Sequence, residues 1–400
     1  MKPESRLIST GTLTRQSMAG QIVIVTGAGG GIGFETARAL AWLGAKVILA
    51  EINSRKGRQA QAQLRAEFDP QCCEFIRTDV GDEGSVRRLA LHVIKKYGQV
   101  DAVLNNATLT PMGAVCDVPI AQWDTSYRVN LRGPVLLARA FLPAMLKRGS
   151  GAFVCVSSVG DQYMSAYETL KSAQVHLARA LDAELEGSGV SAFTMGPGLV
   201  LTETAVDQIS RLAPMYGKSV EEFYAMSAEH MLSVEAAGAG FAAALALAAQ
   251  FRGLEIDTRM ALNAAGISLP EAPGETTSLS EEEFQTAARL CRELRQTLQE
   301  QASGWAQRPL FERQWMLRDF KQYANQSVDQ CLADLADLQT ALDQRDPRLP
   351  GRQAPANLSA YFEHYAELAR NHVKDPQERE EQLQTISTWQ KNAEKLARLL

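Results

Sequence analysis

The chain has 400 residues, of which 46% are hydrophobic and 22% are charged. These fractions are close to the averages of globular proteins and argue against a fibrous or disordered chain, and the length predicts two or three domains. The formal net charge of −5 argues against a nucleic-acid partner, whose binding needs clustered lysine and arginine. Residues 1–20 lack the apolar stretch of a secretory signal, and no run approaches the ~18 apolar residues of a membrane span. We therefore expect a cytoplasmic protein without a membrane span.

The first elements predicted along the chain are a strand at residues 21–26, the β-branched run QIVIVT, and a helix at residues 31–43. A strand at residues 46–50 follows. Strands separated by helices predict a parallel, doubly wound sheet, which makes this part an α/β, Rossmann-like fold. The later predicted strands are 73–76, 102–104, 152–156 and 253–257, and the later helices are 84–97, one after Trp123, one after Ser165 and a buried, alanine-rich one at 236–249.

The spacing of hydrophobic residues along the sequence changes near residue 270. Residues 269–280 form a linker rich in proline, glycine and threonine, and Ser280 with Glu283 forms a capping box that opens a helix. Four amphipathic helices are predicted from there to the end, separated at Gly304-Trp305, at residues 346–356 and at Asp375-Pro376. Residues 281–400 are therefore expected to form an all-α bundle. We expect an N-terminal extension at 1–17, a dinucleotide-binding domain at 18–268, the linker at 269–280 and the helical domain at 281–400.

A glycine-rich turn lies between the first predicted strand and the first helix. Such a turn lets a pyrophosphate approach backbone N–H groups and the positive end of the helix. A tight turn that serves packing alone is the alternative, and the position between strand and helix favours the dinucleotide. The candidate cofactor-binding residues of this turn are Gly27, Gly29, Gly31, Ile32 and Gly33.

Glu51 ends the second predicted strand, about 20 residues past the glycines. A carboxylate here accepts hydrogen bonds from the adenosine ribose and repels a 2′-phosphate, which favours NAD over NADP. Arg55 and Lys56 lie nearby and would weaken this argument if they folded toward the ribose. A solvated loop carboxylate is the alternative interpretation of Glu51.

Tyr167 and Lys171 are spaced i, i+4, so both side chains share one face of a helix. A cation held near a phenol favours the phenolate and lowers the pKa of the tyrosine, which suits a general acid/base. The pair alone would be equally well explained as an exposed aromatic residue and a solvated lysine.

The glycine turn and this pair, with further segments in the same order, resemble the short-chain dehydrogenase/reductase family from residue 18 to about 268. The resemblance implies an NAD(P)-dependent oxidoreductase, with NAD preferred, that interconverts an alcohol and a ketone or aldehyde. The further segments are Asp79-Val80 beside the adenine ring, Asn105-Asn106-Ala107 at a strand end, Asn130 in RVNLRGP, Ser158 in AFVCVSS, and Pro197-Gly198 with Thr202 around the nicotinamide.

The resemblance also implies the roles of the catalytic set. Tyr167 would transfer the proton, and Lys171 would lower its pKa and bind the nicotinamide ribose. Ser158 would stabilise the developing oxyanion, and Asn130 would hold the water of a proton relay.

Two departures from the family pattern concern the substrate side. Thr108 replaces the final glycine of the family's NNAG segment. Only eight residues separate Ser158 from Tyr167, and the family ordinarily has a longer, substrate-lining loop there. The pocket is therefore expected to be reshaped or opened on this side, and Ser157 is an alternative occupant of the serine role.

The last features concern substrate and partners. Residues 203–232 follow Thr202 where the family carries a mobile lid, and their aromatic and methionine side chains suit either a bulky apolar substrate or ordinary helix packing.

The cysteines show no metal-ligand spacing, so no metal is expected. Residues 281–400 lie outside the resemblance, and a homo-oligomer or a protein partner is expected through them. A nucleotide-bound scaffold or sensor that acts through this helical part is the alternative function.

Overall fold

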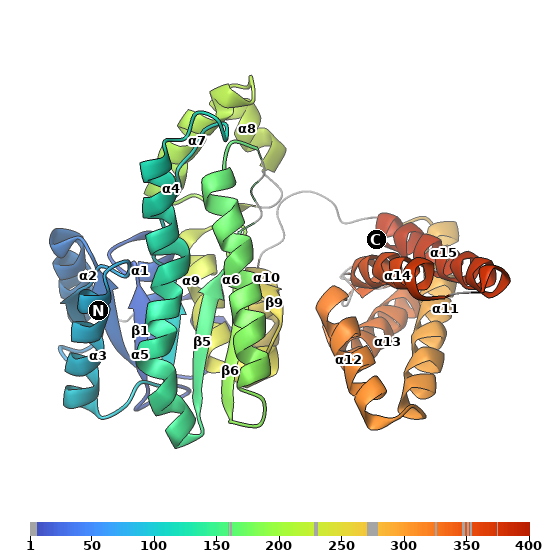
Figure 1. The fold of residues 1–400 in the computed structure, drawn as a ribbon, viewed down its shortest axis with the longest axis horizontal. Coiled ribbons are helices and arrows are strands. Elements are labelled where there is room, and N and C mark those ends of the chain that lie inside the picture. Colours follow the sequence, from blue (N-terminus) through green and yellow to red (C-terminus); the bar gives the residue numbers. More distant parts are fainter. Residues whose placement is uncertain are drawn as a thin grey trace. The chain divides into compact units, whose positions relative to one another are not determined.

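The computed structural model describes residues 6–158, 160, 162–227, 231–269, 279–324, 326–345, 349, 352, 354–373 and 375–400. The chain divides into two compact units, Met1–Ala272 and Pro273–Leu400, and each is described by itself. The first is a parallel sheet with helices on both faces, and the second is helical, which confirms the predicted fold class (Figure 1). Most of the predicted linker lies outside the described residues.

Within the described part of the first unit, seven strands form one sheet in the order β3-β2-β1-β4-β5-β6-β9. All neighbours pair in parallel, so the carboxyl ends of the strands meet at one edge of the sheet. The chain reverses its direction of winding between β1 and β4, which is where such folds bind ligands. The strands are β1 (Ile22–Thr26), β2 (Lys46–Glu51), β3 (Cys73–Arg77), β4 (Ala102–Asn105), β5 (Gly151–Val156), β6 (Val190–Gly196) and β9 (Glu255–Asp257).

The helices of the first unit cover both faces of this sheet. Side chains of α1, α9 and α10 pack on one face, and side chains of α3, α5 and α6 pack on the other (Figure 1). The helices are α1 (Gly31–Trp42), α2 (Ser54–Glu67), α3 (Glu83–Tyr97), α4 (Ile120–Tyr127), α5 (Gly133–Arg148), α6 (Ser165–Glu184), α7 (Glu203–Met215), α8 (Val220–Ser227), α9 (Val234–Ala246) and α10 (Thr258–Ala264). A π-helical turn, Arg128–Arg132, joins α4 to α5, and β7 (Leu199–Val200) pairs with β8 (Met231–Leu232) beside α7.

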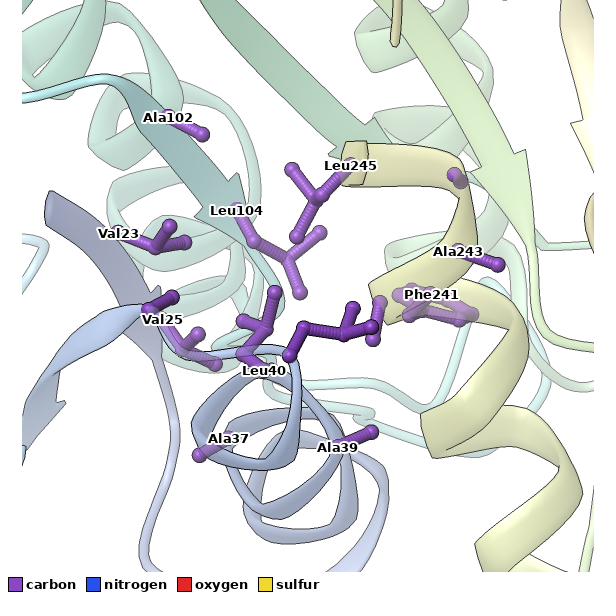
Figure 2. Close-up of a cluster of buried hydrophobic side chains, with 14 of the residues drawn as sticks. Val23, Val25, Ala37, Ala39, Leu40, Ala102, Leu104, Phe241, Ala243 and Leu245 are labelled. Carbon is purple, nitrogen blue, oxygen red and sulfur yellow. The ribbon is translucent and has the colours of Figure 1, made fainter. Parts of the chain in front are cut away.

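The core between the sheet and α1 and α9 depends on small residues. Figure 2 shows Leu40 of α1 facing Phe241 and Leu245 of α9, with side chains of β1 and β4 beside them. A Cβ atom on Gly238 of α9 would lie 2.5 Å from the backbone carbon of Glu35, so α9 can approach α1 this closely only with glycine there. The predicted buried, alanine-rich helix is thus confirmed, because nearly all of its residues are buried.

The N-terminal segment packs on the first unit. Ile8, in the 3-10 turn Leu7–Thr10, is buried, and Thr12 N donates to the carbonyl oxygen of Ala265. Arg6 pairs with Glu67 of α2 and lies over the ring of Phe68. The segment therefore contributes to the core of this unit.

The second unit has a core of its own. Its buried side chains come from each helix of the described part and include the aromatic residues Trp305, Phe320, Tyr361 and Phe362. The rings of Phe320 and Tyr361 lie 4.7 Å apart between their centroids. The helices are α11 (Glu281–Ala306), α12 (Leu310–Tyr323), α13 (Val328–Gln344), α14 (Ala354–His372) and α15 (Pro376–Leu399).

The prediction of four helices in this unit is wrong, since the described residues form five. The stretch predicted as the second helix is broken between Tyr323 and Val328, where the Ser327 side chain accepts from Gln330 N and so caps a new helix. Gly304 and Trp305, expected to separate two helices, lie inside α11 because Trp305 is buried in the core.

Candidate active site at the carboxyl edge of the sheet

The glycine turn joins β1 to α1 and is built so that only glycine fits at several positions. Gly27 and Gly31 have φ values of 64° and 55°, in the left-handed region that disfavours side chains. A Cβ atom on Gly33 would lie 2.4 Å from the carbonyl oxygen of Gly27. A Cβ atom on Gly30 would meet nothing within 4 Å, so the backbone there is open. The side chain of Ile32 packs against the core.

Asn106, just after β4, holds the start of the glycine turn in place through hydrogen bonds. Its Nδ2 atom donates to the carbonyl oxygen of Thr26 over 2.9 Å, and the backbone nitrogen of Ala107 donates to Thr26 Oγ1 over 3.0 Å. The end of β4 thus fixes the end of β1 and the start of the turn. Sequence reasoning placed Asn106 among the cofactor-binding residues, and the structure directs its side chain to the backbone of the turn.

Glu51 reaches from the end of β2 to the same turn. Its Oε2 atom accepts from Gly29 N over 3.1 Å, and its Oε1 atom accepts from Asn53 N over 2.8 Å. The residue is 9% exposed, so the alternative of a solvated loop carboxylate is wrong. Lys56 lies instead near Glu203, with 3.9 Å between Nζ and Oε2.

Asp79 and Val80 follow β3 along the same edge. Asp79 Oδ1 accepts from Gly81 N over 2.9 Å, which fixes this carboxylate in a tight local turn. Val80 is buried, and a Cβ atom on Gly133 would lie 3.3 Å from Val80 Cγ2.

Pro197, Gly198 and Thr202 follow β6 and return to the glycine turn. A Cβ atom on Gly31 would lie 3.2 Å from Thr202 Cγ2, which places Thr202 against the start of α1. Thr202 Oγ1 accepts from Ala205 N and so caps α7. Gly198 has a φ of 73°, and the Pro197 carbonyl oxygen accepts from Thr258 Oγ1 over 3.0 Å. The structure thus brings this segment together with the turn.

Tyr167 and Lys171 lie on one face of α6, as predicted from their spacing. The Nζ atom of Lys171 is 5.5 Å from the centroid of the Tyr167 ring and donates to the carbonyl oxygen of Val156 over 2.8 Å. Lys171 is 1% exposed. The lysine is therefore held between its helix and the end of β5.

The prediction that Lys171 lowers the pKa of Tyr167 is not met in this structure. Burial raises the pKa of Tyr167 to about 12, and the negative charge of Glu168 acts in the same direction. Burial also lowers the pKa of Lys171 to about 8. The loss of solvation on burial outweighs the attraction between the Lys171 ammonium and a Tyr167 phenolate, because Lys171 Nζ is directed to a backbone carbonyl oxygen.

The side chains of Ser158 and Thr108 lie beside Tyr167, and both lower its pKa against the larger, opposite effect of burial. Ser158 Oγ donates to Glu168 Oε1 over 2.7 Å. Ser157, the alternative, is buried beside β6, where a Cβ atom on Gly196 would lie 3.3 Å from its Oγ. The geometry therefore favours Ser158 over Ser157 as the serine next to the tyrosine.

Asn130 lies in the π-helical turn between α4 and α5, and both polar atoms of its side chain form hydrogen bonds. Oδ1 accepts from Thr108 Oγ1 over 2.8 Å and from Leu109 N over 3.1 Å. Nδ2 donates to the Leu109 carbonyl oxygen and to Ser126 Oγ. The main-chain oxygen of Asn130 accepts from Gln174 Nε2.

Three residues of this site were not assigned a role from the sequence. Thr108 was singled out only as a departure from the NNAG pattern, and its side chain lies beside Tyr167 and donates to Asn130. Glu168 and Gln174 follow Tyr167 on the same helix and contact Ser158 and Asn130. The helical spacing of Tyr167, Lys171 and Gln174 was the available signal for Gln174.

The shortened loop and the predicted lid meet through aromatic side chains. Tyr163 has a φ of 64°, and its carbonyl oxygen accepts from Gly113 N over 2.8 Å. The ring of Tyr216, after α7, lies 5.4 Å from that of Tyr163 and 5.7 Å from that of Phe223 in α8, centroid to centroid. Tyr216 Oη donates to the carbonyl oxygen of Gln162. Of the other lid residues, Met215 and Tyr224 are described, Met231 belongs to β8, and the side chain of Met226 lies outside the described residues.

The second unit contains one polar cluster that its sequence spacing did not reveal. His364 Nε2 lies 3.1 Å from Asp319 Oδ1, and the His364 ring stacks on that of Tyr323. Burial raises the pKa of Asp319. In the described part of the chain, no group of three or more metal-ligating side chains is present, and no helix is long and apolar enough to cross a membrane.

Comparisons with known proteins agree with this geometry. A family model described as short chain dehydrogenase matches residues 21–212. The chain is 32% identical over 205 residues to dehydrogenase/reductase SDR family member 4 of Homo sapiens, a match that covers 49% of this chain and 72% of that protein. It is 31% identical over 190 residues to an uncharacterized oxidoreductase of Thermotoga maritima, covering 46% and 73%. Among solved structures, levodione reductase superposes with a TM-score of 0.56 at 24% identity, covering 60% of this chain and 96% of that one.

Proposed function

Because the chain belongs to the short-chain dehydrogenase/reductase family, we propose that it transfers hydride between NAD and a small alcohol or carbonyl compound. One observation carries the proposal. Tyr167 lies beside Ser158 and Thr108, with Lys171 one turn along the same helix, at the sheet edge that also carries the glycine turn. A protein that only bound a nucleotide would have no need of this array.

The residues at the end of β1 fit a dinucleotide. The turn from Gly27 to Gly33 leaves its backbone open at Gly30 and directs the start of α1 toward that space, which suits a pyrophosphate. In this proposal Glu51, Asp79 and Val80 hold the adenosine part. Ala107, Pro197, Gly198 and Thr202 hold the nicotinamide part, with Tyr167 and Lys171 at the reacting end. When bound, the nicotinamide supplies or accepts the hydride.

The preference for NAD over NADP is supported by Glu51. Its carboxylate is buried against the glycine turn, and a 2′-phosphate placed there would face a like charge. Lys56, which could have neutralised that charge, lies near Glu203 instead. We therefore propose that NAD binds more tightly than NADP.

The protein's own groups handle the proton. In this proposal Tyr167 donates its hydroxyl proton to the carbonyl oxygen as the alcohol forms, and accepts it in the reverse direction. Lys171, deprived of solvent, compensates the phenolate that remains. Ser158 positions the reacting oxygen and Tyr167, and Asn130 orients Thr108.

A substrate with a substantial apolar part is supported by the aromatic rings beside the short loop. The ring of Tyr216 contacts the rings of both Tyr163 in that loop and Phe223 in the lid helix α8. Such rings contribute large apolar surfaces and favour apolar ligands. We propose that these rings contact the part of the substrate distant from the reacting carbon.

Assembly into a homo-oligomer is supported by apolar side chains exposed on α4 and α5. Ile120, Tyr127 and Val135 are 74%, 48% and 37% exposed, respectively. Exposed apolar side chains such as these would gain from burial against a second subunit. A protein partner for residues 281–400 is a further proposal, supported by the separate core of that unit.

The experiment that tests the proposed function is an absorbance assay at 340 nm with purified protein. NAD is offered with a panel of secondary alcohols, and NADH with ketones and aldehydes of increasing apolar size. We expect turnover of at least one bulky member. Tight NAD binding without turnover of any member would contradict the proposal and favour a nucleotide-bound scaffold or sensor.

A further inference from the structure

Two buried polar side chains beside the candidate active site, Ser126 of α4 and Gln174 of α6, have no role in the proposed function. Ser126 is 0% exposed and Gln174 is 1% exposed. Buried hydroxyl and amide groups cost free energy unless they form hydrogen bonds. Both side chains bond to Asn130 in the π-helical turn, one to its side chain and the other to its main chain.

Gln174 holds the main chain of the π-helical turn. Its Nε2 atom donates to the carbonyl oxygen of Asn130, which lies 44 positions earlier in the chain. The Oε1 atom of Gln174 is buried and has no hydrogen-bond partner among the described residues. An apolar side chain of similar length would avoid that cost, so the amide stabilises this position only through its bond to Asn130.

Ser126 links the same turn to the start of α6. Its Oγ atom accepts from Asn130 Nδ2 over 2.8 Å and donates to the carbonyl oxygen of Ala166 over 2.6 Å. Ala166 is the residue directly before Tyr167. The hydroxyl of Ser126 therefore connects the asparagine side chain to the backbone beside the tyrosine.

The two links enclose the reacting end of α6. The link through Ser126 reaches α6 one residue before Tyr167, and Gln174 lies three positions after Lys171. The tyrosine and the lysine therefore stand between two points at which α6 is bonded to the π-helical turn.

The same asparagine holds the segment that follows β4. Asn130 Oδ1 accepts from Thr108 Oγ1 and from Leu109 N, and Nδ2 donates to the Leu109 carbonyl oxygen over 2.7 Å. This segment begins directly after Ala107, to which the proposed function gives the nicotinamide part. A displacement of Asn130 would thus change the distance between that segment and Tyr167.

We propose that Ser126 and Gln174 are positioning residues for hydride and proton transfer. By holding Asn130 against α6, they fix the distance between Tyr167 and the segment that carries the nicotinamide part. This inference rests on the proposed function. Rates of transfer depend steeply on such distances, because the reacting atoms must be held in a near-attack geometry. Loss of either link should therefore lower kcat and leave the affinity for NAD almost unchanged.

The test uses the purified full-length protein and Gln174→Met, which keeps the length of the side chain and removes the donor. Gln122→Met, at an exposed glutamine of α4, is the matched control. The first readout needs no substrate: the amide hydrogen exchange of Leu109, whose N–H donates to Asn130, followed by NMR. We expect exchange about tenfold faster in Gln174→Met than in wild type, and no change in Gln122→Met. Unchanged exchange in Gln174→Met would overturn the proposal.

The second readout is steady-state kinetics with NAD and the best substrate of the panel. We expect kcat to fall about tenfold in Gln174→Met, while the Kd for NAD stays within about twofold of the wild-type value. Calorimetric titration measures the Kd, and the melting temperature shows that the variant is folded. A wild-type kcat, or an equal loss in kcat and in affinity for NAD, would contradict the proposal.

Ser126→Ala removes the other link and gives an independent test if Gln174→Met does not fold. Ser172→Ala, at an exposed serine of α6, is its control. We expect the same pattern, with faster exchange at Leu109 and a lower kcat at unchanged affinity for NAD, and wild-type values of both would refute the proposal. If the wild-type protein turns over no member of the panel, the proposed function fails, and the exchange of Leu109 then decides whether the two residues hold Asn130.

Discussion

Thr108 Oγ1 donates a hydrogen bond to Asn130 Oδ1 over 2.8 Å, and the Thr108 side chain also lies beside Tyr167, whose pKa it lowers. A residue that departs from the glycine of the NNAG pattern is therefore a neighbour of both the tyrosine and the asparagine of the π-helical turn.

Replacement of Thr108 by valine keeps the shape of the side chain and removes this hydroxyl. We expect kcat/KM to fall about fivefold, because a hydrogen bond in such a site contributes about 1 kcal/mol. Thr108→Ser keeps the hydroxyl and should stay close to wild type. Steady-state kinetics with thermal melts of both variants check this. Equal activity in Thr108→Val and wild type would show that the hydroxyl has no part in the reaction.

Replacement of Glu51 by alanine should change the choice of cofactor. The carboxylate faces the place proposed for the adenosine ribose and would repel a 2′-phosphate. Its loss should therefore lower the ratio of the Kd for NADP to the Kd for NAD by about tenfold. Calorimetric titration with each nucleotide measures both constants. The prediction fails if the wild-type protein binds the two equally, or if the ratio is unchanged in the variant.

Burial of Lys171 predicts a pH dependence of stability. Its pKa is about 8 in the folded protein against 10.5 for an ordinary lysine, so the unfolded chain binds more protons between these values and stability rises with pH there. As pH falls from about 10.5 to 8, burial of Lys171 lowers the free energy of unfolding by on the order of 3 kcal/mol. Urea unfolding of wild type and Lys171→Met at both ends of this range isolates it, since other groups titrate alike in the two proteins. Parallel stability curves would contradict the prediction.

The two units should unfold separately, because each has its own buried core. Leu335 is fully buried in the second unit, and its replacement by alanine should cost about 2–5 kcal/mol there. In differential scanning calorimetry we expect Leu335→Ala to lower one transition and leave the other in place. Leu40→Ala in α1 is the matched variant for the first unit. A single transition that both variants shift equally would show that the units unfold together.

The parts of the site that could be predicted from the sequence depend on local spacing. A β-branched run before glycines predicts strand, turn and helix, and the i, i+4 interval places Tyr167 and Lys171 on one face. Ser280 with Glu283 predicts the start of α11 for the same reason, and the capping box is present.

The parts that could not be predicted depend on where distant segments meet. Thr108 and Asn130 lie 22 positions apart, and their contact follows from the π-helical turn between α4 and α5. The hydrogen bond between Ser158 and Glu168 depends on the path of the short loop. The raised pKa of Tyr167 results mainly from burial, which spacing along one helix does not reveal. Spacing along the sequence predicted which residues lie on one face of a helix. The tertiary fold determined which hydrogen bonds those residues form.

The most direct test of the central claim is the rate of NAD-linked turnover in Tyr167→Phe compared with wild type. The variant lacks only the hydroxyl, so we expect NAD binding and thermal stability close to wild type and a loss of kcat of at least about 100-fold with the best substrate of the panel. Turnover at the wild-type rate in a variant that binds NAD normally would contradict the account.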